Sequence, residues 1–142
     1  MIKYFLIFLI ILPAAGFCGQ PQVCFKNACV NVEMARTEEE TALGLSGRDK
    51  LKDNQGMLFI FDTADKYSFW MKDMTFDLDI IWLDDEGKVV DIKSDFKPCT
   101  PDACPAYAPQ SNARYVLEVD AGYCQTKGLN IGSKLELRNI YK

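Results

Sequence analysis

A chain of 142 residues that is 49% hydrophobic and 25% charged has the composition of one ordinary globular domain, which excludes disordered and collagen-like proteins. Its 16 Lys and Arg against 20 Asp and Glu give a net charge of -4, and no block of basic residues occurs. Binding to the phosphate backbone of a nucleic acid is therefore not expected.

Residues 1–18 have the pattern of a secretory signal peptide. Lys3 gives a short positive start, residues 4–12 form an unbroken apolar run, and residues 13–16 supply the small side chains that signal peptidase requires. Cleavage is expected before Phe17 or before Gly19. Residues 19–142 would then be one exported domain, periplasmic or extracellular, with no membrane contact beyond the signal segment.

Two other interpretations of this segment stay open. The apolar run is shorter than the roughly 20 residues that span a bilayer, which disfavours an uncleaved anchor. A lipid attached to Cys18 would hold the protein on a membrane, but such a site requires a small residue before the cysteine, and Phe17 is bulky. Lipid anchoring at Cys18 is therefore the less favoured alternative.

Six cysteines behind an export signal predict disulfides, because the oxidising side of the membrane preserves them. Cys24 and Cys29 share their spacing with Cys99 and Cys104, and each pair would close a short loop worth about 2 kcal/mol. Zinc binding by these four thiols is the alternative. Exported thiols are more often oxidised than metallated, so no metal is expected.

Cys124 then has Cys18 as its only remaining partner, and this third pair requires that cleavage spares Cys18. Otherwise Cys124 is a free thiol in the core. Redox catalysis is disfavoured, because thioredoxin-like enzymes place two residues between their cysteines, whereas four separate each pair here.

The first elements predicted are a hairpin and a helix. Alternating side chains predict strands at residues 23–25 and 29–35 around a turn at residues 26–27. Thr37 and Glu40 have the spacing of a capping box, so a helix should begin there and end at Gly47. Its expected core residues are Ala42, Leu43 and Leu45.

The central part of the chain predicts further strands. Residues 56–61 are a short apolar run typical of a strand buried on both faces, and residues 69–71 are another such piece. Residues 78–83 and 88–92 are expected to pair as an antiparallel hairpin around Gly87.

Residues 96–112 contain four prolines and are expected to form a long loop, stiffened by the Cys99–Cys104 bond. A strand should follow at residues 114–119. A helix is predicted from a cap at Asp120 to Lys127, and a last strand at residues 134–140. These elements predict an α+β fold: a single domain with a mainly antiparallel or barrel-like sheet and two short helices.

Five motifs occur in a recognisable order: residues 42–48 (ALGLSGR), 56–59 (GMLF), 69–72 (FWMK), 78–80 (LDI) and 115–118 (YVLE), the last followed by Gly122 and Gly132. Over about residues 29 to 140 the chain resembles the widespread prokaryotic family called domain of unknown function 192. The resemblance implies a compact β-rich fold and no established activity. The family commonly has Asn and Thr after its Trp-Met-Lys motif and Pro before Leu-Asp-Ile, whereas this chain has Asp73, Met74 and Asp77.

The chain contains no histidine, which excludes Ser-His-Asp and Cys-His catalysis and imidazole metal sites. The candidate site residues are polar or aromatic positions inside otherwise apolar motifs that match the family: Arg48, Trp70, Lys72, Asp79 and Glu118. Buried charges are costly unless paired, so these residues either form internal ion pairs or face a ligand. The internal alternative pairs Arg48 or Lys72 with Asp79 or Glu118.

The leading hypothesis is a monomeric, non-enzymatic binding domain of the cell envelope that uses no cofactor. Lys72 and Asp79 would share a polar pocket with Arg48 and Trp70 beneath the 99–104 loop, and Asp73 and Asp77 would form a turn. The expected partner is a small anionic or hydroxyl-rich ligand, or an envelope protein, with the Trp70 ring as a stacking face.

Two alternatives remain. One is a histidine-free hydrolase or lyase for envelope saccharides, with Asp79 and Glu118 as acid and base. The other is a purely structural envelope protein. Trp82 is expected in the core, and Tyr107 either at the rim of the pocket or exposed.

Overall fold

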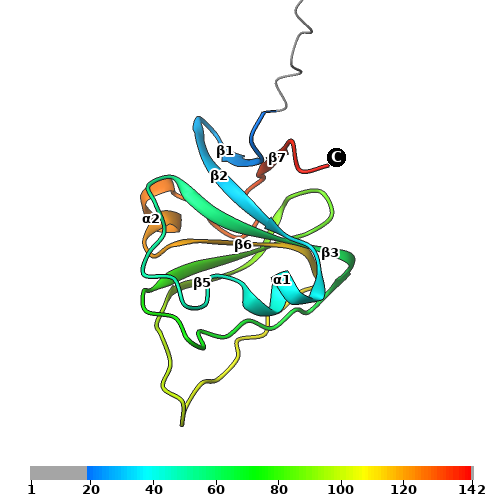
Figure 1. Cartoon of the computed structure of the whole chain (residues 1–142). Coiled ribbons are helices and arrows are strands. Elements are labelled where there is room, and N and C mark those ends of the chain that lie inside the picture. Colours follow the sequence, from blue (N-terminus) through cyan, green and yellow to red (C-terminus); the bar gives the residue numbers. More distant parts are fainter. Residues whose placement is uncertain (1–18, 142) are drawn as a thin grey trace, which may run out of the picture.

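The computed structural model describes residues 19–141, which form seven strands and two short helices. The strands make one sheet that curls into a half-barrel, in the order β5-β4-β6-β3-β2-β1-β7 (Figure 1). In chain order the elements are β1 (Gln22–Phe25), β2 (Ala28–Ala35), α1 (Glu38–Leu43), β3 (Gln55–Asp65), β4 (Leu78–Leu83), β5 (Val89–Phe96), β6 (Ala113–Asp120), α2 (Tyr123–Lys127) and β7 (Glu136–Arg138). The predicted α+β, mainly antiparallel, barrel-like class is confirmed.

The first hairpin is the predicted one. β1 and β2 pair antiparallel around residues 26–27, and Lys26 adopts the left-handed conformation that such a tight turn requires. Cys24 lies directly opposite Cys29 in the register, and the two form a disulfide across the strands. The alternation of apolar and polar residues in β2 therefore predicted its pairing and its buried face correctly.

The capping box is present as expected. The Thr37 hydroxyl accepts a hydrogen bond from the Glu40 amide at 3.1 Å, and the Glu40 carboxylate accepts one from the Thr37 amide at 3.0 Å. The helix ends at Leu43 rather than at Gly47, because Gly44 takes a positive φ of 50°. Of the three expected core residues only Leu45 is buried, since α1 is short and lies on the surface with Ala42 and Leu43 exposed.

α1 lies in the connection between β2 and β3, which form the one parallel pair in the sheet of the described residues. β3 in turn pairs antiparallel with β6, and β6 with β4, so these strands lie in the middle of the sheet. All six residues of β4 are buried. The β4–β5 hairpin turns at Gly87, whose φ of 80° fits the predicted corner.

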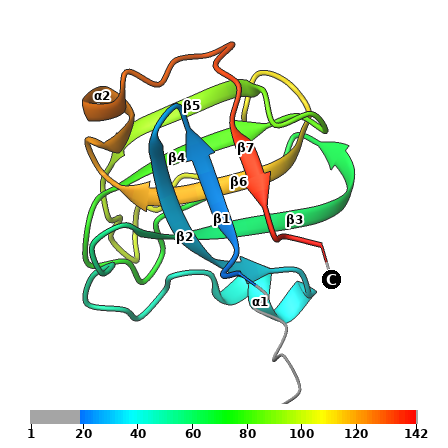
Figure 2. The same ribbon diagram turned by 90° about the horizontal axis from the view of Figure 1, so that it is seen from above.

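The sheet separates two apolar clusters. Its inner face is enclosed where β1, β2 and β7 cross over β6, and this cluster contains Leu58, Leu117 and Ile81 (Figures 1 and 2). Its outer face carries Phe59 and Trp82 and is covered by α1 and the long loops. Successive residues of a strand point to opposite faces, so every second residue of a strand joins the same cluster.

Other elements also differ from the prediction. Residues 69–71 do not form a strand, and only Phe69 makes an isolated bridge, with Tyr107. Asp120 is the last residue of β6 and does not cap α2, which begins after Gly122. The last strand contains only Glu136–Arg138. Each of these ends is decided by pairing with distant residues, which local patterns do not report.

Both predicted short-range disulfides are present, Cys24 with Cys29 and Cys99 with Cys104, so these thiols do not form a zinc site. Cys124 is buried and makes no disulfide within residues 19–141. Cys18 and the whole predicted signal peptide lie outside the described residues. Within the described part of the chain, no helix is long and apolar enough to cross a membrane.

Candidate functional site

A groove of about 560 Å³ opens beside Trp70, whose side chain is 53% exposed. One wall consists of Trp70, Lys72 and Asp73, and the other of the disulfide-closed loop, through residues 99–101 and Cys104. A large aromatic side chain left half exposed at the wall of a groove is typical of a binding site.

Buried neighbours hold the Trp70 wall in place. Met71, the next residue, is 1% exposed and packs into the outer-face cluster. Phe69, the previous residue, exchanges two backbone hydrogen bonds with Tyr107, at 2.9 and 2.7 Å. With both of its neighbours fixed in this way, Trp70 is held at the surface.

The opposite wall is anchored by one buried carboxylate. Asp91 of β5 accepts hydrogen bonds from the Tyr107 hydroxyl at 3.2 Å and from the Gln110 amide at 2.8 Å. Tyr107 is therefore half buried against Trp82 and is neither a rim residue nor an exposed one. Burial and the adjacent Asp91 raise the pKa of the Tyr107 hydroxyl, which keeps it a hydrogen-bond donor.

The groove offers three kinds of contact at one place. The Lys72 ammonium lies 5.4 Å from the centre of the Trp70 ring, within the range of a cation–π interaction. Neither Lys72 nor Asp73 forms an ion pair with any residue between 19 and 141. A flat aromatic face, a free donor and a free acceptor are the groups that bind a ring with several hydroxyls.

Glu118 lies close to this groove but deeper. It projects from β6 on the outer face, is 5% exposed, and lines a cavity of about 40 Å³ that Trp70 also lines. Its Oε2 atom has no hydrogen-bond partner. Burial raises the pKa of Glu118 to about 8, because a carboxylate without water or a counter-charge is costly.

Asp79 is not part of the groove, contrary to the prediction. It is fully buried and accepts hydrogen bonds from the backbone amides of Asp95, at 2.9 Å, and Cys124, at 2.8 Å. Asp79 is two residues before Ile81 of the inner-face cluster, so its side chain points to the inner face. The Glu118 side chain projects from the opposite, outer face of the sheet. Asp79 therefore ties β5 and α2 to β4 and does not face a shared pocket with Lys72.

Arg48 is also removed from the groove. Its guanidinium forms a two-point ion pair with Glu33 of β2, with N–O distances of 2.7 and 2.8 Å. The hydrogen bonds from Arg48 lower the pKa of Glu33. The alternative of bridges from Arg48 or Lys72 to Asp79 or Glu118 is therefore wrong. The outward position of Glu33 between Val32 and Met34 was the sequence signal for this partner, and it was missed.

The predicted turn residues behave as expected in part. Asp73 has a positive φ of 57°, as a turn residue, and its carbonyl accepts a hydrogen bond from the Gly47 amide at 3.0 Å. Asp77 forms an exposed ion pair with Lys97. Of the five candidate residues, Trp70 and Lys72 line the groove, Glu118 lines the adjoining cavity, and Arg48 and Asp79 lie elsewhere.

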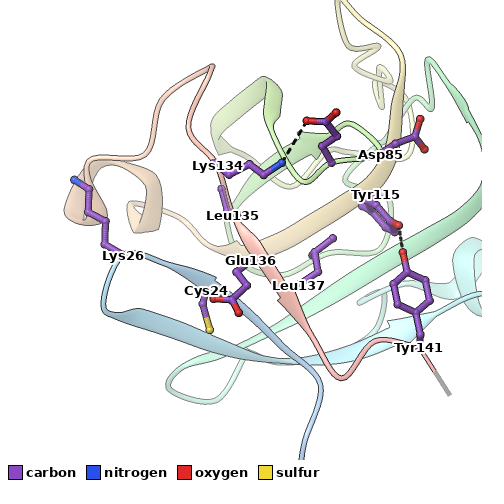
Figure 3. Close-up of a pocket in the computed structure, with 10 residues that line it drawn as sticks. Cys24, Lys26, Asp85, Tyr115, Lys134, Leu135, Glu136, Leu137 and Tyr141 are labelled. Carbon is purple, nitrogen blue, oxygen red and sulfur yellow. Dashed lines mark hydrogen bonds and ion pairs between the residues drawn. The ribbon is translucent and has the colours of Figure 1, made fainter.

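A second groove, of about 550 Å³, lies between β7 and the β4–β5 turn (Figure 3). Most of its polar side chains are already paired with each other or with neighbours: Tyr141 contacts the Tyr115 hydroxyl, and Lys134 forms an ion pair with Glu86 at 3.6 Å. Burial and the Tyr141 contact raise the pKa of Tyr115 to about 12. This groove therefore has fewer free groups for a ligand than the one beside Trp70.

Comparison with known proteins identifies the family. The model of the domain of unknown function 192 family (DUF192), described as uncharacterized ACR, matches residues 22–137. No curated protein matches the sequence significantly. A protein of unknown function from Novosphingobium aromaticivorans DSM 12444 is similar in structure, with a TM-score of 0.73 and 28% identity over 82% of each chain.

A second solved structure is similar in fold. It is a protein from Sinorhizobium meliloti 1021 described as a "putative transcription regulator", with a TM-score of 0.73 and 24% identity over 84% of this chain and 93% of that one. Both structures share the fold of this chain, and the predicted family resemblance is confirmed by the family model.

Proposed function

The chain belongs to the domain of unknown function 192 family, and we propose that it is an exported binding domain that holds a small hydroxyl-rich ligand in the groove beside Trp70. The observation that carries this proposal is the half-exposed indole of Trp70 facing a disulfide-closed loop. An exposed tryptophan of this kind is the stacking face that sugar rings use, and Lys72 and Asp73 add a donor and an acceptor next to it.

The location in the cell envelope is part of the same proposal. Two disulfides support an oxidising compartment, because reduced thiols prevail in the cytoplasm. The groove wall itself includes the Cys99–Cys104 disulfide, so the proposed site requires oxidation to keep its shape. Export and binding are therefore linked in this proposal.

A two-carboxylate hydrolase or lyase has less support. Asp79 and Glu118 project from opposite faces of the sheet, so no substrate bond can lie between them. Asp79 is in addition committed to two backbone amides. The hydroxyl-rich ligand is favoured over an anionic one because Asp73 offsets the charge of Lys72 in the groove wall.

The proposal is tested by titrating the protein with three disaccharides, one of glucose, one of N-acetylglucosamine and one of glucuronic acid, and following the Trp70 indole N–H signal by NMR. At least one neutral sugar is expected to shift this signal. Trp70→Ala, which lacks the signal, should bind that sugar tenfold or more weakly when the affinity is measured by calorimetry. Tyr141→Ala, which removes a 68% exposed aromatic from the second groove, is the control and should not change affinity. If binding depends on Tyr141 and not on Trp70, the ligand occupies the second groove and the proposal is wrong.

A further inference from the structure

Glu118 has a polar atom that the described structure leaves unsatisfied. Its Oε2 is the one buried side-chain oxygen or nitrogen of residues 19–141 that has no hydrogen-bond partner within the protein. An unpaired buried polar group costs about 1 to 3 kcal/mol, so its presence inside an apolar cluster requires an explanation. A partner that binds from outside would supply one.

The cavity in front of Glu118 has room for such a partner. Its volume of about 40 Å³ exceeds the roughly 10 to 15 Å³ that a cavity needs to hold one water molecule. The end of α1 with the following turn (residues 41–46) forms one wall, and Phe59, Phe69, Trp70 and Met74 form the rest. The space therefore fits one small polar group and excludes a sugar ring.

The walls of this cavity carry no compensating charge. Glu118 is the one titratable residue among those that line it, and its neighbours across the sheet, Met57 of β3 and Ile80 of β4, are apolar. The nearest cation on the Trp70 segment, Lys72, lines the groove and not the cavity. A cation entering the cavity would thus meet a single carboxyl group with no competing partner.

Trp70 connects the groove to the cavity, because it lines both. The indole already attracts one ammonium group, that of Lys72, at 5.4 Å from the ring centre. An aromatic face beside an unpaired carboxyl group is a combination that favours a cation over a neutral hydroxyl. A ligand stacked on the indole has the cavity immediately beside it.

We propose that the cavity beneath Trp70 is a subsite for one primary ammonium group, which pairs with Glu118, so that the ligand is a saccharide with a free amine. This inference rests on the proposed function, since the sugar ring occupies the groove while only its amine enters the cavity. The neutral carboxyl group of the empty site gives its proton to solvent as the ammonium group enters, and one proton is released for each ligand bound.

Proton release makes binding depend on pH in a defined direction. Burial raises the pKa of Glu118 to about 8 in the empty site, and an ammonium partner lowers it again. Between about pH 5 and 7 the affinity should therefore rise by up to tenfold for each pH unit. The affinity of a ligand that only stacks in the groove is not expected to depend on pH in this way.

The test compares three β-linked disaccharides of the same shape, built from glucosamine, N-acetylglucosamine or glucose, by calorimetry with the exported protein and its Glu118→Gln variant. The glucosamine disaccharide should bind at least tenfold tighter than the other two at pH 7 and release a proton, and Glu118→Gln should abolish both the preference and the proton release. Glu39→Gln, the same change at an exposed position outside both the groove and the cavity, is the matched control and should keep the preference and the proton release.

A second measurement separates the two proposals. Butylammonium, an amine without a sugar, is added while the Glu118 side-chain carboxyl is titrated by carbon NMR, and it should lower the titration midpoint. If the three sugars bind equally and butylammonium has no effect, the groove function stands and the ammonium subsite is overturned. If no sugar binds but butylammonium lowers the midpoint, the subsite stands and the saccharide function fails. If none of the sugars binds and butylammonium leaves the Glu118 titration unchanged, both the saccharide function and the ammonium subsite are overturned.

Discussion

Asp79 and Glu118 lie on adjacent strands, one residue out of register with each other, and their side chains enter opposite faces of the same sheet. Asp79 accepts two backbone hydrogen bonds, whereas the Oε2 atom of Glu118 has no partner. One carboxyl group therefore stabilises the fold, and the other is held in an unfavourable setting next to a groove. Replacing each of them should therefore have a different effect on stability.

Glu118→Gln should make the stability of the protein less dependent on pH. Burial raises the pKa of folded Glu118 to about 8 from its ordinary value of 4.5, so the folded state holds this proton more tightly than the unfolded state. Stability is fully present below about pH 4.5 and is lost as the pH rises to about 8, by at most about 1.4 kcal/mol per unit. Urea unfolding of both proteins at pH 5 to 8 checks this, and parallel curves would contradict it.

Asp79→Asn should destabilise the fold. Asparagine presents one acceptor oxygen, so the amide of either Asp95 or Cys124 loses its partner inside the protein. An unsatisfied buried donor costs about 1 to 3 kcal/mol, and the free energy of unfolding should fall by this amount. Asp49→Asn, at an exposed position, is the control and should stay within about 0.5 kcal/mol. Equal effects of the two changes would refute the anchoring role of Asp79.

The two disulfides offer a matched pair of variants, because both join residues five apart. Replacing the cysteines of either pair by serine should cost about 2 kcal/mol in the chain-entropy description. Only the Cys99 and Cys104 double variant should also weaken ligand binding, since this disulfide is part of the groove wall. The Trp70 indole signal measures the difference, and an equal shift in both double variants would argue against the assignment.

The mass of the protein isolated from its native cells tests the predicted signal peptide. We expect a chain that begins at Gly19 or Phe17, carries no lipid and gains the hydrogens of two disulfides on reduction. Cys124 should resist alkylation until the protein is unfolded, because its thiol is buried and burial raises its pKa. A third disulfide would show that Cys18 is retained and paired with Cys124, and a lipid on Cys18 would contradict cleavage as predicted.

Local patterns in the sequence predicted local structure well. The capping box of Thr37 and Glu40, the turn at Gly87 and the two short-range disulfides all depend on residues a few positions apart, and all are present. Asp120 is a case in which the local pattern gave a wrong prediction. Its local sequence suits a helix cap. In the structure Asp120 pairs with Leu78, and this long-range pairing makes it the last residue of β6.

The site was predicted in part for the same reason. Trp70 and Lys72 were predicted to lie beneath the 99–104 loop, and both line the groove that this loop closes. The separation of Asp79 from Glu118 depends on strand register, which only the folded sheet fixes. The parallel pairing of β2 with β3, and the contact of Arg48 with Glu33 that accompanies it, are likewise long-range features.

The two ends of the described domain meet, since the Asn139 side chain donates a hydrogen bond to the Gln20 carbonyl at 3.3 Å. This junction lies beside β1 and β7, on the side of the molecule away from the 99–104 loop (Figure 1). A reporter, surface linker or fluorescent label joined at either end therefore leaves the loop side free to face its surroundings.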